Sequence, residues 1–119
     1  MAGVISAIGV QQKRKNRVNI YLDDRYAFSV NAVVAERAGL AVGSFLSDED
    51  VAKLTGDDSY QKAFDTALNF LSYRPRTERE VRQNLSKKGI HSKVIEAVVA
   101  RLSELRLLDD KAFAEFWQE

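Results

Sequence analysis

The sequence of 119 residues lacks cysteine and has a single histidine, His91. Without cysteine the chain has no disulfide, iron–sulfur cluster or thiolate zinc site, and one imidazole has no partner with which to complete a zinc site. No apolar run reaches the roughly 18 residues that a membrane span needs. The N-terminus is no secretory signal, because its cations follow the apolar stretch instead of preceding it. The sequence therefore predicts a cytoplasmic globular protein without metal or cofactor.

The sequence also has no large excess of charge of one sign, because it contains 18 Lys and Arg and 17 Asp and Glu. The charges are nevertheless sorted along the chain. Five basic and two acidic residues lie in 11–25, two and six in 36–60, seven and two in 72–93, and three and six in 94–119. Such blocks usually form solvated faces, and they also create local fields that attract a charged partner.

A catalytic constellation is missing from the sequence as well. The acidic clusters fall where turns and helix starts are expected, and none has the spacing of a calcium loop. His91 lies in a short connection and is expected to be a solvated spacer. The loop at 39–43 has two glycines but lacks the lysine and hydroxyl of a phosphate-binding loop. We therefore expect a protein that is not an enzyme.

Over the first thirty positions, apolar residues alternate with a period of two, which predicts β-strands. The strands are expected around 4–10, 18–22 and 26–30, with a hairpin connection at Asp23-Asp24-Arg25. A longer link between the first two strands forms a basic loop with Lys13, Arg14 and Lys15. We expect a three-stranded antiparallel meander that needs other elements packed on its apolar face.

From Asn31 onward the apolar period becomes helical. Asn31 is expected to cap a short helix over 32–38 that Gly39 ends. Ser47 begins a second helical stretch, which 56–59 (Gly-Asp-Asp-Ser) is expected to interrupt. We place the domain boundary there, with a β-meander and short helical segment in 1–58 and an all-α three-helix repeat in 59–119. The predicted fold class is α+β.

The later helices are indicated by their ends. Thr77 and Glu80 have capping-box spacing, Gly89 stops that helix, and Ser92 is expected to cap the next one. Asp109 is expected to cap a last helix that carries three aromatic residues, Phe113, Phe116 and Trp117. Because the sequence stops inside this pattern, we expect a truncated last helix whose aromatic face allows self-association.

Three motifs in the helical half belong together: Tyr73-Arg74-Pro75-Arg76, then Lys87-Lys88-Gly89, then Leu107-Leu108-Asp109-Asp110 followed by Phe113-Ala114. With them, the run from 71 to 117 resembles the repeated three-helix unit of the RecX family, regulators of the recombinase RecA. The segment RKNRVNIYLDDRYAFSV is similar to the β-containing N-terminal region of many family members. One departure is Arg106, which stands where the family usually has glycine and predicts a different turn or a strained left-handed residue.

The resemblance implies a non-enzymatic regulator that binds RecA filaments on single-stranded DNA. It implies inhibition of RecA ATPase and strand exchange in homologous recombination, DNA repair and the SOS response. A weak direct contact with DNA is a further expectation, and no contact with a membrane is expected. The candidate partner-binding residues are cations of 72–93 and of the basic loop: Arg74, Arg76, Arg79, Arg82, Lys87, Lys88, Lys13, Arg14 and Lys15.

Within this set, Arg74 and Arg76 are expected to matter most, because Pro75 restricts the backbone between them and pre-organised charges lose less entropy on binding. An alternative interpretation is a small nucleic-acid-binding module with a helix-turn-helix-like α domain and a basic hairpin that grips phosphates. Its recognition helix would be 78–88, with Gln83 and Asn84 at base edges. Salt-dependent binding to naked DNA favours the module, whereas DNA binding that requires RecA favours the regulator.

Overall fold

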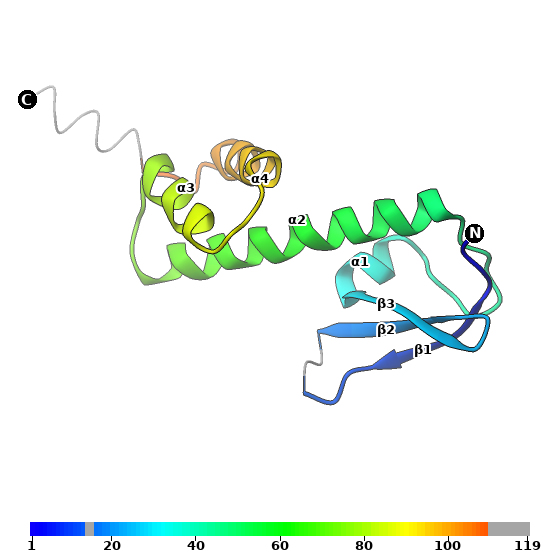
Figure 1. Cartoon of the computed structure of the whole chain (residues 1–119). Coiled ribbons are helices and arrows are strands. Elements are labelled where there is room, and N and C mark those ends of the chain that lie inside the picture. Colours follow the sequence, from blue (N-terminus) through cyan, green and yellow to red (C-terminus); the bar gives the residue numbers. More distant parts are fainter. Residues whose placement is uncertain (14–15, 110–119) are drawn as a thin grey trace, which may run out of the picture. The chain divides into compact units, whose positions relative to one another are not determined.

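The computed structural model describes residues 1–13 and 16–109, which hold a three-stranded sheet followed by helices (Figure 1). In chain order the elements are β1 (Ile5–Val10), β2 (Arg17–Leu22), β3 (Arg25–Asn31), α1 (Ala32–Arg37), α2 (Asp48–Tyr73), α3 (Glu78–Lys87) and α4 (Ser92–Glu104). The predicted α+β class is thereby confirmed. The chain divides into two compact units, Met1–Gln61 and Lys62–Glu119. Because α2 runs through this division and through the predicted boundary after residue 58, the domain limits stay a prediction.

The sheet of the first unit is an antiparallel meander in the order β1-β2-β3. Asp23 and Asp24 alone connect β2 to β3, with φ angles of 49° and 67°. Positive φ at both central residues is what a two-residue hairpin with the twist of the flanking strands requires, and Asp tolerates it. The predicted hairpin is therefore confirmed, with Arg25 already inside β3.

The core of the first unit lies on one face of this sheet. Its buried residues come from the strands, from α1, from the loop after α1 and from the start of α2: Ile5, Val18, Ile20, Val30, Val34, Ala35, Leu46 and Leu54. Asn31 caps α1 as expected, because its side chain accepts the backbone N–H of Val33 at 2.8 Å. Gly39 follows the helix in the left-handed region, with φ 66°. The sheet thus gains the apolar cover that three strands need.

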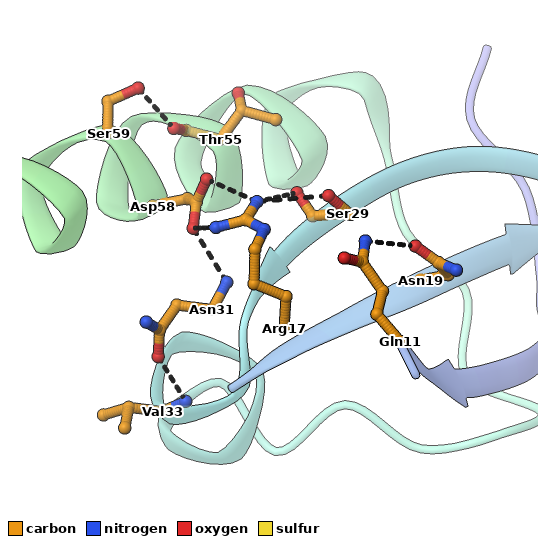
Figure 2. A network of polar contacts seen from close by, with 9 residues as sticks. All are labelled: Gln11, Arg17, Asn19, Ser29, Asn31, Val33, Thr55, Asp58 and Ser59. Carbon is orange, nitrogen blue, oxygen red and sulfur yellow. Dashed lines mark hydrogen bonds and ion pairs between the residues drawn. The ribbon is translucent and has the colours of Figure 1, made fainter. Parts of the chain in front are cut away.

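The expected interruption at 56–59 is wrong, because α2 is continuous from Asp48 to Tyr73. A glycine inside a helix costs about 1 kcal/mol, and contacts on either side of Gly56 offset that cost. Leu54 is buried in the core of the first unit. Asp58, in the next turn, is buried and accepts hydrogen bonds from β2 and β3 (Figure 2). Long-range contacts therefore override a local breaker signal.

The second unit holds the end of α2 with α3 and α4. Its core consists of buried apolar residues from the three helices: Ala63, Ala67, Val81, Leu85, Ile95, Val98, Val99 and Leu102. The helix after 92 begins one residue earlier than predicted, because His91 is the N-cap and its Nδ1 accepts the N–H of Lys93 at 3.1 Å. Imidazole is an uncommon cap, so the neighbouring serine is the stronger sequence signal. The predicted last helix with Phe113, Phe116 and Trp117 lies outside the described residues.

Helices α1, α3 and α4 end in the same way. A residue with positive φ follows each helix, and the backbone N–H groups of this residue and of the next one donate to carbonyls of the last helical turn. Gly39 and Gly89 occupy that position after α1 and α3. After α4 it is Arg106, with φ 58°, and Leu107 N–H donates to Leu102 C=O at 3.0 Å. Of the two alternatives expected at Arg106, a different turn or a strained left-handed residue, the structure has the second, and the turn is the same as after α1 and α3.

Candidate interaction surface

The first turn of α3 is fixed by a reciprocal pair of hydrogen bonds. The hydroxyl of Thr77 accepts the N–H of Glu80 at 3.2 Å, and the Glu80 carboxylate accepts the N–H of Thr77 at 3.2 Å. This confirms the predicted capping box and leaves few unsatisfied donors at the helix start. Val81 and Leu85 are fully buried, so the rotation of α3 about its axis is set by the core.

Arg79, Gln83 and Lys87 lie on the side of α3 opposite the buried Val81 and Leu85. These three residues lie at i, i+4 and i+8, so they follow one another along one face, and all are exposed. We call them the α3 cationic face. In the part of the chain that the structure describes, neither Arg79 nor Lys87 has an ion-pair partner. Lys88, directly after α3, is exposed as well.

Arg76 is much less accessible than Arg79 and Lys87, since its side chain is only 15% exposed. The guanidinium carbon lies 3.9 Å from the centroid of the Phe70 ring, and Nε donates to the Phe70 carbonyl at 3.4 Å. The Arg76 carbonyl in turn accepts the N–H of Asp109 at 2.9 Å. Arg76 thus ties the end of α2 to the segment after α4.

Arg74 lies on the other side of Pro75 and is bound at both ends of its guanidinium. Nη2 is 2.6 Å from the Glu80 carboxylate, and Nη1 donates to the Pro75 carbonyl at 2.9 Å. The hydrogen bond from Arg74, followed by the one from the Thr77 N–H, holds the pKa of Glu80 below its usual range. More than half of the Arg74 side chain remains exposed.

Arg82 joins α3 to α4. Its Nε donates to Glu78 at 3.0 Å within α3, and its terminal nitrogens pair with Glu96 of α4. The hydrogen bond from Arg82 lowers the pKa of Glu96, and the two glutamates together raise the pKa of Arg82. The charge of Arg82 is therefore balanced inside the second unit.

The structure places six of the nine candidate residues in the second unit. Lys13 is exposed and belongs to the first unit, whereas Arg14 and Lys15 lie outside the described residues. Sequence reasoning missed Phe70 as the partner of Arg76 and missed the buried partner of Arg17. A Phe six residues before an Arg across a helix end gives no periodic signal, because the contact depends on the turn between them.

Within residues 1–13 and 16–109, no group of three or more His, Asp or Glu could hold a metal ion. The same residues include no helix that is both long enough and apolar enough to cross a membrane.

Comparisons with known proteins match both units. The family model described as "Regulatory protein RecX N-terminal domain" matches residues 3–47, and "RecX, first three-helix domain" matches residues 63–102. Regulatory protein RecX of Bacillus velezensis is 45% identical over 111 residues, which cover 93% of this chain and 42% of the relative. The protein of the same name from Bacillus subtilis is 43% identical over 110 residues, with 92% and 42% covered.

A solved structure, "Crystal structure of regulatory protein RecX", is similar with a TM-score of 0.80 and 34% sequence identity. The similarity covers 98% of this chain and 57% of that one. The chain thus spans about two fifths of the length of the curated relatives it matches, with 42% of each of the two Bacillus proteins covered.

Proposed function

This chain belongs to the RecX family, and from that premise we propose that it is a non-enzymatic regulator. It binds RecA filaments on single-stranded DNA and lowers their ATP hydrolysis and strand exchange. The relatives are named regulatory proteins, which supports the role of regulator. The filament as partner and the inhibitory direction are the finer part of the proposal.

The observation that carries the proposal is the α3 cationic face. Arg79 and Lys87 project from a helix that is fixed by its capping box and by two fully buried residues. Cations on such a rigid element lose less conformational freedom on binding than cations on a loop. An arginine also makes two parallel hydrogen bonds to a carboxylate or phosphate. This face therefore suits an acidic groove of a protein filament.

The other arginines are less available to a binding partner than this face, because they already have contacts within the chain. Arg76 is stacked and mostly buried, and Arg82 is balanced by two glutamates, so a partner would first have to displace internal contacts. Arg74 is half-exposed and paired with Glu80. The expectation that Arg74 and Arg76 dominate binding stays a prediction, and its test must separate binding from folding.

A filament-binding titration tests the proposal. Preformed RecA filaments on fluorescently labelled single-stranded DNA, held with a non-hydrolysable ATP analogue, are titrated with the 119-residue chain at two salt concentrations. We expect saturable binding that requires RecA, and we expect Arg79→Glu with Lys87→Glu to weaken it by about tenfold or more. The matched control places the same charge change on α2, with Lys53→Glu and Lys62→Glu, both exposed.

The outcomes separate the two classes of function. Equal weakening by both double variants would mean that only total charge matters, which contradicts a docking face on α3. Binding to naked DNA that RecA does not strengthen would favour the nucleic-acid-binding module instead.

A further inference from the structure

β1 lies at one edge of the sheet, and the chain covers only the first half of its outer side (Figure 1). There the segment 43–46 runs antiparallel to it. Ile5 N–H donates to the Ser44 carbonyl at 2.8 Å, and Leu46 N–H donates to the Gly3 carbonyl at 2.9 Å. A shift in the pairing with β2 follows Ile5. Beyond it, no strand of the described residues pairs with the outer side of β1.

The second half of β1 has unused backbone groups on this outer side. In an antiparallel pair, residues turn their N–H and C=O alternately toward the neighbouring strand and away from it. Gln11 N–H donates to the Arg17 carbonyl of β2 at 3.2 Å. By alternation Gly9 also faces β2, whereas Ile8 and Val10 face outward. In residues 1–13 and 16–109, no backbone group pairs with these two residues on that side.

This free edge lacks the features that usually keep edge strands apart. Proteins protect such edges with charged side chains or with proline. Residues 1–12 contain neither a charged side chain nor a proline. Val10 is 66% exposed although its side chain is apolar. The edge is therefore open to another strand, and its own side chains do not repel a second copy.

Gly9 lies in the middle of the free edge, and no contact in the described part of the chain requires a glycine there. Its φ is not positive. A Cβ at this position would meet only the Tyr21 ring, at 3.8 Å, which is an ordinary contact distance. Glycine inside a strand weakens it, and it often marks a position where another backbone approaches closely.

We propose that the outer edge of β1 pairs with the same edge of a second copy, antiparallel and with the two-fold axis at Gly9. Ile8 of each copy exchanges backbone hydrogen bonds with Val10 of the other, because the same groups face outward in both. The exposed Val10 side chain then lies beside Ile8 of the other copy. The two Gly9 residues are opposite each other, where the Cα atoms of paired strands come closest, at about 4.5 Å.

The ends of the free edge favour this orientation and register. The edge runs over residues 6–12, between the segment 43–46 and the exposed Lys13, and Gly9 is at its centre. Antiparallel pairing places the Lys13 side chains of the two copies at opposite ends, so like charges stay apart. One pair of short strands buries less than the roughly 1,200 Å² of stable complexes, so the dimer is weak. The contact lies in the first unit and does not involve the aromatic residues after Asp109.

The test is sedimentation equilibrium of the 119-residue chain over a range of concentrations. We expect a monomer–dimer equilibrium, and we expect Val10→Lys to raise its dissociation constant by about tenfold or more. Val33→Lys is the matched control and should leave the constant unchanged, because Val33 is 47% exposed and follows β3 at the other edge of the sheet. Val10→Pro removes an outward N–H without removing a bond to β2, so it should weaken the dimer as well.

A covalent link tests the position of the axis. The sequence has no cysteine, so Gly9→Cys introduces a single thiol into each copy. Opposite residues on the axis are close enough for a disulfide. We therefore expect oxidised glutathione to convert Gly9→Cys, but not Val33→Cys, into a covalent dimer.

Three outcomes would overturn the proposal. One is a chain that stays monomeric at its highest soluble concentration, and another is the same dissociation constant for Val10→Lys and Val33→Lys. The third is a dimer that is lost in Phe116→Ala with Trp117→Ala but kept in Val10→Lys, which would place the contact on the aromatic residues after Asp109. A monomeric chain whose binding to RecA filaments is weakened by Val10→Lys would instead make this edge a docking strand for the filament. Far-UV circular dichroism confirms that each variant is folded.

Discussion

Arg17 and Asp58 form a buried, two-pronged ion pair between β2 and α2, with 3.0 Å between Nη1 and Oδ1 and 3.1 Å between Nη2 and Oδ2. Both side chains are less than a tenth exposed. Arg17 also donates to the carbonyl and hydroxyl of Ser29, and Asp58 also accepts the N–H of Asn31 at 2.7 Å (Figure 2). The pair thereby holds α2 at the end of the β2–β3 ribbon.

Removing one partner of this pair should leave an uncompensated buried charge. We predict that Asp58→Ala lowers the free energy of unfolding by about 3–5 kcal/mol, measured by urea denaturation followed by circular dichroism. The neighbouring exposed Asp57→Ala is the control and should change stability by less than about 0.5 kcal/mol. Replacing both partners with apolar residues, as in Arg17→Met with Asp58→Leu, should cost less than Asp58→Ala alone. Equal effects of the two single aspartate variants would contradict this account.

Arg106 should be a position where glycine stabilises the chain. Its φ of 58° disfavours any residue with a Cβ, and the cost is about 1–2 kcal/mol. Glycine would remove this cost, but part of the gain in stability is offset because glycine makes the unfolded chain more flexible. We predict that Arg106→Gly raises the free energy of unfolding by about 0.5–1 kcal/mol in thermal or urea unfolding, whereas Arg106→Ala does not. A loss of stability on Arg106→Gly would show that the arginine side chain makes a contact worth more than the strain.

Arg76 should contribute to the stability of the second unit through its stacking on Phe70. The ring lies 3.9 Å from the guanidinium carbon in a partly buried site, where such contacts are worth about 1–2 kcal/mol. We predict that Arg76→Ala lowers the free energy of unfolding by that amount. In a chain that already has Phe70→Leu, we predict that Arg76→Ala lowers the free energy of unfolding by much less. Full additivity of the two substitutions would rule out the stacking contribution.

The capping box of α3 should weaken in acid. The pKa of Glu80 is lowered in the folded chain by the hydrogen bonds from Arg74 and Thr77, from a usual value of 4.5. A lowered folded pKa means that the stabilisation is present above the usual pKa and is lost as the pH falls through the folded value. We predict that the stability difference between the wild type and Glu80→Gln shrinks as the pH falls from about 7 to about 3, as followed by urea unfolding. A difference that is independent of pH would contradict the capping role of the carboxylate.

The elements that the sequence predicts well are those with local causes. Asp23-Asp24, Asn31 and the Thr77–Glu80 pair act on backbone groups within a few residues, so their patterns can be recognised without the fold. The continuity of α2 could not be predicted in this way. Gly56 and its polar neighbours look like a break until Asp58 meets Arg17, which is 41 positions away.

The candidate interaction surface shows the same limit. Composition identifies the cations of 72–93, but it does not separate Arg79, which is exposed, from Arg82 and Arg76, which have internal partners. That distinction depends on the rotation of α3 and on the turn at Pro75. Both are set by packing in the second unit.

The most direct test of the central claim is the steady-state ATP hydrolysis rate of RecA on single-stranded DNA, measured against increasing concentrations of the 119-residue chain. We expect the wild type and the Lys53→Glu with Lys62→Glu control to lower the rate along the same curve. We expect Arg79→Glu with Lys87→Glu to raise the half-inhibiting concentration by about tenfold or more. An unchanged hydrolysis rate with the wild-type chain, or identical curves for the two double variants, would contradict it.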